Sequence, residues 1–430
     1  MNFVIEALGL TAGGGKAGLL RLLPALAGQG RRHKFVAVLA DLEEFRVLER
    51  SNLRVILQQK PASLLRRHLH LQQTVPRICA DERADVLLCL GNFGPWRPLL
   101  PTVVLMHNAR YVSGDVVRQT LRERLITWYG RRYLRRLRGD VRLLVQTELM
   151  KQRLVEAHGI APSRIVVIPD SDALPPETGR TAYQRPCYSA VRKGSAFPRD
   201  GEQNQAFVVL PEGGSLSAPQ GGKPANSSFT FLCLARYYPH KNLEVLVKAM
   251  KRLSAHSRRS ARCLLTIHPD QHPGAQKLLR KIVSERLEQI LVNIGPLDGN
   301  EVVEAYRSAD ALILPSLLES FGRTYLEAMR FDLPILTSDR DFAHEVCAGA
   351  ALYFDPLDPE SVARSMARIM EDTELRDRLA AERRGIPIRS WDEVAARFVD
   401  VLERAATEPK SCTLVNQRLS ALRQFVDRRS

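Results

Sequence analysis

The sequence lacks long apolar runs, basic residues in its first nine positions and paired cysteine spacings. Among its 430 residues, no run approaches the roughly 20 consecutive apolar residues of a membrane-spanning helix. The first nine residues lack the basic segment of a signal peptide and are typical of a strand. The 7 cysteines show no paired spacing and several lie in apolar runs, which favours buried free thiols over disulfides or metal ligands. We expect a cytoplasmic protein.

Acidic residues are scarce in the first part of the chain. Residues 1–170 carry 27 Lys and Arg against 14 Asp and Glu, whereas residues 229–430 carry 30 against 28. The excess peaks in 118–142, where arginines alternate with Leu, Trp and Tyr at helical spacing. This pattern is typical of peripheral contact with an anionic membrane, worth about 1 kcal/mol per basic residue near the surface, or of a solvated basic face. We expect no nucleic-acid partner, because no recognised nucleic-acid motif accompanies the charge.

Short apolar runs alternate with amphipathic helical stretches in both halves, which is typical of parallel α/β sheets. Between the halves the composition changes to Pro, Gly, Ser and Gln with little periodicity; Phe207–Leu210 is one candidate strand there. The other predicted strands are Asn2–Leu8, His33–Leu39, Val55–Leu57, Val86–Leu90, Val103–Met106, Leu143–Val145, Ile165–Ile168, Phe229–Leu234, Ala261–Ile267, Ile290–Ile294, Ala311–Leu314, Leu333–Thr337 and Ala351–Phe354.

These patterns divide the chain into four parts. Residues 1–170 are expected to form a Rossmann-like domain, and 229–386 a second one. Residues 171–228 between them form a low-complexity linker or insertion. Residues 387–430 contain a closing helix, starting at Trp391, that crosses back to the first domain and is followed by a tail. The predicted fold class is α/β, with two doubly wound domains.

Residues 311–330 carry the most informative motif. The apolar run Ala311–Leu314 predicts a buried strand, Pro315 ends it, and a helix follows. Glu319 then lies at the mouth of the strand-to-helix turn, with Glu327 further along the helix. A glycosidase pair needs its carboxyls within roughly 10 Å of each other across one bond. A helix rises about 12 Å over eight residues, so glycoside hydrolysis is disfavoured.

Glu-x7-Glu inside Pro-Ser-x2-Glu-Ser-Phe-Gly-x-Thr-x2-Glu-Ala-Met resembles the donor-site signature of the family 4 retaining glycosyltransferases, the group 1 glycosyltransferases. The likeness is strong over 229–400 and weak over 1–170. It implies a GT-B architecture, in which two Rossmann-like domains face each other across a cleft. The acceptor would bind the first domain and the nucleotide sugar the second. The donor-binding residues that this motif implies are Glu319 on the sugar hydroxyls, Ser320, Phe321, Gly322, Thr324, and Glu327 on the ribose diol.

Two cations follow the first strand of the second half. Arg236 and Lys241 lie between a predicted strand and a helix starting at Leu243. There an arginine can bind two phosphate oxygens and a lysine adds a point charge; the alternative is a pair of solvated cations. The Lys-Asn-Leu ending resembles the family's donor motif, although Ala235 replaces the glycine often found before the arginine. The likeness implies that both cations stabilise the leaving diphosphate.

Two features of the first half extend the resemblance. His107 ends a predicted strand, where open α/β sheets place ligands. A lone histidine is more often structural, but the resemblance implies a place near the donor sugar and the acceptor. Leu10–Gly18 is rich in glycine, precedes a helix predicted at Leu19–Ala27, and lets the backbone approach an anion. A tight turn without a ligand is the alternative, and the resemblance places Gly13 and Gly14 over the donor phosphate.

The expected function is retaining transfer of a hexose from a UDP- or GDP-linked sugar to a hydroxyl of a glycan or lipid-linked glycan, in cell-surface polysaccharide synthesis. The resemblance implies His107, Arg236, Lys241 and Glu319 as catalytic residues. We expect no metal or other cofactor. The alternatives are a nucleotide-sugar epimerase and a non-catalytic nucleotide-sugar-binding protein of the same fold.

Overall fold

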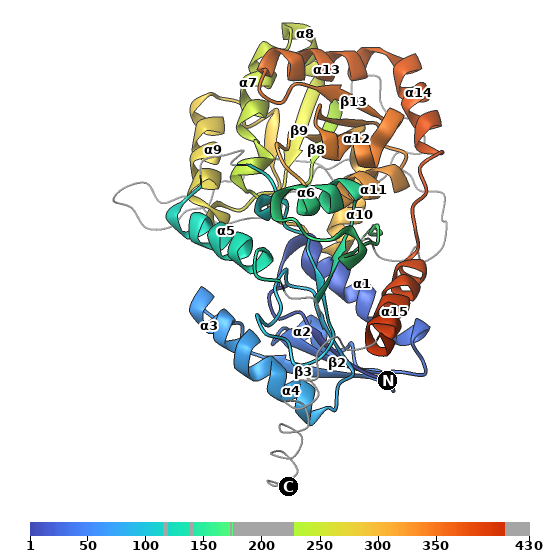
Figure 1. The fold of residues 1–430 in the computed structure, drawn as a ribbon. Coiled ribbons are helices and arrows are strands. Elements are labelled where there is room, and N and C mark those ends of the chain that lie inside the picture. Colours follow the sequence, from blue (N-terminus) through green and yellow to red (C-terminus); the bar gives the residue numbers. More distant parts are fainter. Residues whose placement is uncertain (115–118, 138–140, 173, 175–227, 409–430) are drawn as a thin grey trace. The chain divides into compact units, whose positions relative to one another are not determined.

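The structure, a computed structural model, describes residues 1–114, 119–137, 141–172, 174 and 228–408 (Figure 1). The chain divides into two compact units. The first contains Met1–Ala173, Glu319–Arg323 and Ile388–Ser430, and the second contains Leu174–Leu318 and Thr324–Pro387. The predicted linker lies almost wholly outside the described residues, as do the strand predicted at Phe207–Leu210 and the tail after residue 408.

The first unit is built on seven parallel strands in the order β3-β2-β1-β4-β5-β6-β7. In register, Phe3 lies opposite Phe35 on one side and Val86 on the other. The chain order reverses direction between β1 and β4, so their carboxyl ends form the switch point at which open α/β sheets bind ligands. The strands are β1 (Asn2–Glu6), β2 (Lys34–Ala40), β3 (Leu53–Gln58), β4 (Val86–Cys89), β5 (Thr102–Leu105), β6 (Val141–Val145) and β7 (Ile165–Val167).

The helices of this unit differ from the prediction at one point. Helix α1 begins at Gly13, whereas the sequence predicted a start at Leu19. Apolar periodicity could not show this first turn, because its glycines make no packed side-chain contacts. The α-helices are α1 (Gly13–Gln29), α2 (Glu43–Arg46), α3 (Leu64–Leu69), α4 (Val75–Asp81), α5 (Leu121–Leu134), α6 (Glu148–His158) and α15 (Trp391–Thr407), with a π-helical turn η1 (His70–Thr74) joining α3 to α4.

Helix α15, near the end of the described chain, belongs to the first unit and lies beside α1 (Figure 1). It starts with a capping box between Ser390 and Glu393. Its buried face, which includes Phe398 and Leu402, joins the core cluster that covers β1. The indole N–H of Trp391 donates to the carbonyl of Asp172 at 2.6 Å. The last described helix is therefore an integral part of the first unit's core.

The second unit is built on six parallel strands in the order β10-β9-β8-β11-β12-β13. Its chain order reverses between β8 and β11, which pair directly, with Ala311 opposite Phe231. This is the doubly wound order of nucleotide-binding sheets, with its switch point at the carboxyl ends of those two strands. The strands are β8 (Phe229–Cys233), β9 (Ala261–Leu265), β10 (Leu291–Asn293), β11 (Ala311–Leu314), β12 (Ile335–Ser338) and β13 (Ala351–Phe354). The helices are α7 (Glu244–Arg252), α8 (Ala255–Ser260), α9 (Pro273–Ser284), α10 (Gly299–Ser308), α11 (Arg323–Arg330), α12 (Asp341–Cys347), α13 (Pro359–Glu371) and α14 (Thr373–Arg383), with a 3-10 turn η4 (Pro239–Lys241).

The predicted α/β class with two doubly wound sheets is confirmed, and each strand predicted within the described residues is present. The five cysteines in the described part of the chain are free and buried, as expected; Cys187 and Cys412 lie outside it. Burial raises the pKa of Cys79 to about 12, so this thiol stays protonated at neutral pH. No helix of the described chain has both the length and the apolar character needed to cross a bilayer.

Candidate functional site

The two motif loops that follow β8 and β11 meet at the switch point of the second sheet. The first loop follows β8 and runs to α7, and the second follows β11 and runs to α11. The backbone N–H of Leu317 donates to the carbonyl oxygen of His240 at 2.7 Å. One hydrogen bond therefore joins the loop that carries Arg236 and Lys241 to the loop that leads into Glu319.

The loop after β8 is held rigidly around its two cations. The backbone N–H of Ala235 donates to Thr266 Oγ1 at 3.1 Å, and that of Tyr237 donates to Gln271 Oε1 at 2.8 Å. Asn242 adopts a left-handed backbone conformation at the end of η4, and its amide donates to the carbonyl of Pro356 at 2.8 Å. Between these fixed points Arg236 is exposed and Lys241 is half-buried. The predicted strand-end position of this cation pair is confirmed.

The loop after β11 forms the predicted strand-to-helix turn. Glu319 lies between the end of β11 and the start of α11, and it is half-buried. The turn requires a glycine at position 322, because φ there is +82°. The neighbouring Phe321 is buried, whereas Ser320 and Thr324 are half-buried. Position and backbone geometry thus agree with a turn that presents main-chain amides, as the motif predicts.

Helix α11 is fixed to its neighbours by buried polar contacts. The hydroxyl of Tyr306 donates to Glu327 Oε2 at 2.8 Å, and Glu327 is only 6% exposed. Two residues earlier, the hydroxyls of Tyr325 and Thr337 lie 2.8 Å apart and link the helix to β12. Tyr306 could not be identified from the sequence as a partner of Glu327, because the two lie on different helices.

In the first unit, His107 follows β5 at the carboxyl edge of the sheet, as predicted. Its backbone N–H donates to Asn92 Oδ1 at 2.8 Å, and its ring Nε2 lies 3.0 Å from Asn92 Nδ2. The pKa of His107 is lowered to about 4, mainly by burial; the charge of Arg323 acts in the same direction and that of Asp170 in the opposite one. The ring is therefore neutral near pH 7.

The predicted glycine-rich segment forms the exposed first turn of α1. Gly13 has φ +57°, and no side chain caps the helix N-terminus. The N-terminal amide groups of such a helix are donors for an anion. Gly14 is also exposed. Lys16, one turn into the helix, pairs with Glu44 at 2.8 Å.

A buried ion pair at the end of β1 was not found from the sequence. Glu6 has no exposed surface, and both of its oxygens accept from Arg67, at 2.5 and 2.8 Å. Its Oε1 also accepts the backbone N–H of Leu8 at 3.1 Å. A Cβ atom at position 91 would lie 2.6 Å from Arg67 Nη2, so this packing requires Gly91. The only indication in the sequence was a glutamate at the end of an apolar strand. This residue does not indicate its partner, which is 61 residues away.

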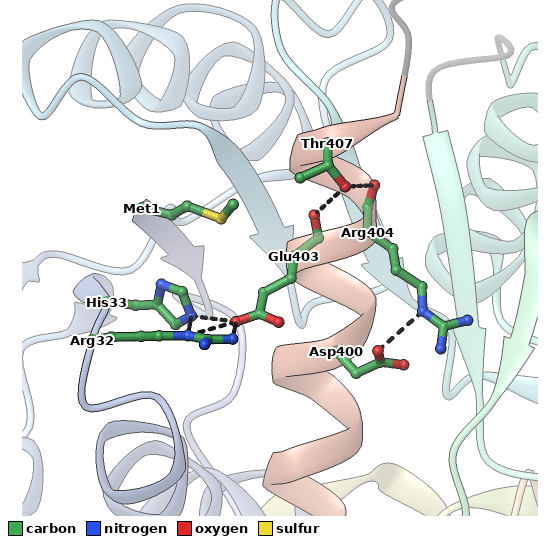
Figure 2. A pocket seen from close by; sticks show the side chains of 7 residues that line it. All are labelled: Met1, Arg32, His33, Asp400, Glu403, Arg404 and Thr407. Atoms are coloured by element: carbon green, nitrogen blue, oxygen red, sulfur yellow. Dashed lines mark hydrogen bonds and ion pairs between the residues drawn. The ribbon is translucent and has the colours of Figure 1, made fainter.

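A cavity of about 480 Å³ lies elsewhere on the first unit, between α15 and the start of β2 (Figure 2). Figure 2 shows the His33 ring and the Arg32 guanidinium on the same side of the Glu403 carboxylate, where both contact Oε1; His33 Nε2 lies 2.6 Å from it. Its lining includes Met1, at the amino end of the sheet. This is the edge opposite to the switch point, so we assign this cavity to packing of α15 and not to the active site.

Two Asp-x-Asp triplets, 170–172 and 339–341, contain carboxylates that could bind a metal. Both are engaged with protein groups: Asp170 accepts from Gln146 Nε2 at 2.5 Å, and Asp339 pairs with His344 at 2.7 Å. Within the described residues, no three His, Cys, Asp or Glu side chains gather as a metal site would require.

Comparison with known proteins agrees with this geometry. Residues 218–385, which contain both motif loops, match the family model described as "Glycosyl transferases group 1". The match to this family is confined to the second half of the chain. The O-antigen chain mannosyltransferase RfbU of Salmonella typhimurium is 31% identical over 131 residues, covering 30% of this chain and 35% of RfbU. The chain spans about half or less of the curated relatives that it matches.

Solved glycosyltransferases match almost the whole chain. WaaG, a glycosyltransferase involved in lipopolysaccharide biosynthesis, superposes with a TM-score of 0.67 at 14% identity, over 94% of this chain and 99% of WaaG. HepE of Anabaena, solved in complex with UDP and glucose, superposes with a TM-score of 0.63 at 14% identity, over 94% and 99% of the two chains. At these identities the matches show the fold, and they confirm the predicted GT-B architecture.

Proposed function

We propose that this protein is a retaining group 1 glycosyltransferase that transfers a hexose from a UDP- or GDP-linked sugar to a hydroxyl of a glycan or lipid-linked glycan. The hydrogen bond from Leu317 to His240 carries the proposal. This bond joins the loop that carries Arg236 and Lys241 to the loop that leads into Glu319. Both loops lie at the switch point of a doubly wound sheet, where such sheets bind ligands. A nucleoside diphosphate sugar needs cations for its phosphates and a hydrogen-bond acceptor for its sugar hydroxyls, and the two loops carry both residue types.

Each motif residue has a role in this proposal. Arg236 and Lys241 bind the diphosphate and stabilise the negative charge that grows on it as the glycosidic bond breaks. Glu319 accepts hydrogen bonds from the sugar hydroxyls, and Glu327 accepts them from the ribose diol, because an ionised carboxylate can accept two hydroxyls. The amides around Gly322, together with Ser320, Phe321 and Thr324, contact the sugar and phosphate, and Gly13 and Gly14 add amide donors from α1.

The relatives support the substrate class. RfbU is named as a mannosyltransferase of the O-antigen chain, and HepE was solved with UDP and glucose. Both names fit a nucleotide-sugar donor and a polysaccharide product for this chain. We propose that no metal takes part; an excess of EDTA would then leave the rate of donor turnover unchanged, and loss of turnover restored by Mg²⁺ or Mn²⁺ would contradict this.

We further propose that the first unit receives its acceptor at the cytoplasmic face of an anionic membrane. Helix α5 exposes Leu121, Leu125 and Trp128 beside several arginines. Helix α3 exposes Leu65 and is joined to α5 by the hydrogen bond between His68 and Tyr129. Apolar side chains flanked by arginines are the composition of a membrane-surface helix.

Sedimentation with vesicles tests this contact. The full chain should pellet with vesicles that contain phosphatidylglycerol and remain in solution with pure phosphatidylcholine. A chain with Leu125→Glu and Trp128→Glu should lose that binding and keep its turnover of soluble donor. Equal sedimentation of the parent and the variant would contradict a membrane role for α5.

A thermal-shift screen of nucleoside diphosphates and their sugars tests the function at the donor site. At 100 times its Kd, a ligand stabilises the folded state by about 2.7 kcal/mol. We expect a rise in Tm with UDP or GDP, and stabilisation by neither would contradict the proposal. Turnover then separates the alternatives. An epimerase yields an isomerised nucleotide sugar without acceptor, and a non-catalytic binding protein yields no product.

A further inference from the structure

Asn92 contacts His107 at two points, and together these points define the protonation of the ring. The backbone N–H of His107 can only donate, so the Asn92 atom that lies 2.8 Å from it is the amide oxygen. The other end of the same amide is then the NH₂ group, which lies 3.0 Å from His107 Nε2. Since an amide NH₂ only donates, Nε2 must accept. The neutral ring therefore carries its hydrogen on Nδ1.

We propose that Asn92 is a positioning residue that holds His107 in the Nδ1–H tautomer, so that His107 offers substrate a hydrogen-bond donor and not a base. His107 Nδ1 has no hydrogen-bond partner among the described residues of the structure. The inference rests on the proposed function, because it assigns the direction of one hydrogen bond in that reaction. A group facing Nδ1 must then be an acceptor, such as a sugar hydroxyl oxygen.

The backbone of Asn92 supports this role. Its φ is +68°, in the left-handed region that side chains other than those of Asn and Asp adopt only at a cost. It follows β4 at the switch point of the first unit, and β4 pairs with β5, which leads into His107. A left-handed turn is thus placed beside a neighbouring strand end, so that one amide contacts both the backbone N–H and the ring Nε2 of His107.

Two substitutions of Asn92 distinguish the effect of its side-chain hydrogen bonds from the effect of its backbone conformation. Asn92→Gly keeps the left-handed conformation without strain and removes both hydrogen bonds. Asn92→Asp keeps the size and the acceptor for the backbone N–H, but turns a donor into an acceptor opposite Nε2. That ring nitrogen must then carry a hydrogen, so the tautomer is inverted when the ring is neutral. Asn108→Asp is the matched control, since it adds the same charge in the residue next to His107. The side-chain oxygen of Asn108 accepts from the backbone N–H of Arg110 at 3.1 Å.

Nitrogen-15 NMR of the histidine rings in the full chain tests the tautomer directly, with His107→Gln used to assign the signal. The parent and Asn108→Asp should show Nε2 unprotonated and Nδ1 protonated, and Asn92→Asp should show Nε2 protonated. A parent ring that is protonated at Nε2 would overturn the inference. This NMR measurement does not require turnover, so its outcome is independent of the proposed function.

The pH profile of donor turnover is a second test. In Asn92→Asp, activity should fall with rising pH if His107 is a hydrogen-bond donor and rise with pH if it is a base. For the parent, kcat for hydrolysis of UDP-glucose or GDP-mannose should show no titration of His107 between pH 5.5 and 8. In Asn92→Asp the new carboxylate raises the pKa of His107. The charged ring still donates from Nδ1, whereas the neutral Nε2–H ring does not.

The activity of Asn92→Asp should therefore fall about tenfold as pH rises through the pKa of His107, equivalent to about 1.4 kcal/mol. Arg323 and Asp170, the charged groups that act on the ring, are present in parent and variant alike. Activity that rises with pH instead would identify His107 as a base and contradict the proposal. Asn92→Gly should lower kcat with little change in Tm; a loss of Tm without a change in kcat would reduce Asn92 to a structural residue.

Discussion

The hydroxyl of Tyr306 on α10 donates a hydrogen bond of 2.8 Å to Glu327 on α11, and both side chains are buried. Tyr306 also stacks on Phe331, with ring centroids 5.3 Å apart. The carboxylate that we assign to the ribose diol is thus oriented from behind by a rigid aromatic residue. This arrangement makes the role of Glu327 testable without touching it.

Tyr306→Phe keeps the stacked ring and removes the donor to Glu327. Because hydrogen bonds to charged groups contribute about 1.5–3 kcal/mol, we expect the free energy of unfolding to fall by that order in urea titrations. The Kd for UDP or GDP should also rise, since the carboxylate loses its orientation. A normal Kd in a destabilised variant would limit the pair to a structural role.

Lys241→Ala and Arg236→Ala should each lower kcat for donor hydrolysis about 100- to 1,000-fold, because each removes a charge that stabilises the leaving diphosphate. Lys277→Ala, which removes an exposed lysine from α9 of the same unit, is the control and should leave kcat unchanged. Single-turnover measurements with saturating donor separate this loss from weaker binding. Equal kinetics in all three variants would contradict the assigned roles.

Arg67→Ala leaves the Glu6 carboxylate buried without its cation. Breaking such a buried pair typically costs about 3–5 kcal/mol, so we expect a large fall in the free energy of unfolding. The double variant Glu6→Leu with Arg67→Met should regain most of it, because the uncompensated charge is removed. If the single substitution left stability unchanged, the pair would contribute little to the folded state.

The Arg32 guanidinium hydrogen-bonds to Glu403 and lowers the pKa of this carboxyl, with His33 acting in the same direction (Figure 2). A carboxyl whose pKa is lower in the folded state stabilises the protein above its unfolded pKa of about 4.3. That contribution is lost as pH falls through the folded value. Glu403→Gln should therefore flatten the acid limb of a Tm-against-pH curve, with the Tm at neutral pH lowered. A variant with the parent's acid limb would exclude this contact as a source of acid sensitivity.

The strands were predictable because each is an apolar run closed by glycine, proline or polar residues, and Ala311–Leu314 has the predicted ends. The motif loops were predictable because their function depends on residues that are close in sequence, such as Arg236 and Lys241. The start of α1 was not, since Gly13 and Gly14 carry no periodic signal.

Contacts between distant segments could not be predicted from one sequence. Asn92 and His107 are 15 residues apart and meet only because β4 pairs with β5. Nothing in either residue's neighbours in the chain indicates the partner. The same holds for Tyr306 and Glu327, whose distance is set by the packing of two helices. Sequence therefore indicated which residue types carry the chemistry, and the fold determined how they are oriented.

Turnover of nucleotide sugars by the full chain tests whether this protein is a nucleotide-sugar-dependent glycosyltransferase. The chain is incubated with UDP-glucose or GDP-mannose, with and without a glycan acceptor, and the released nucleoside diphosphate is measured by chromatography beside Lys241→Ala and Glu319→Ala. We expect release by the parent chain, stimulation by acceptor, an α-linked product from an α-linked donor, and loss of release in both variants. Release that is equal in the parent and both variants, or absent with every nucleotide sugar that stabilises the fold, would contradict this function.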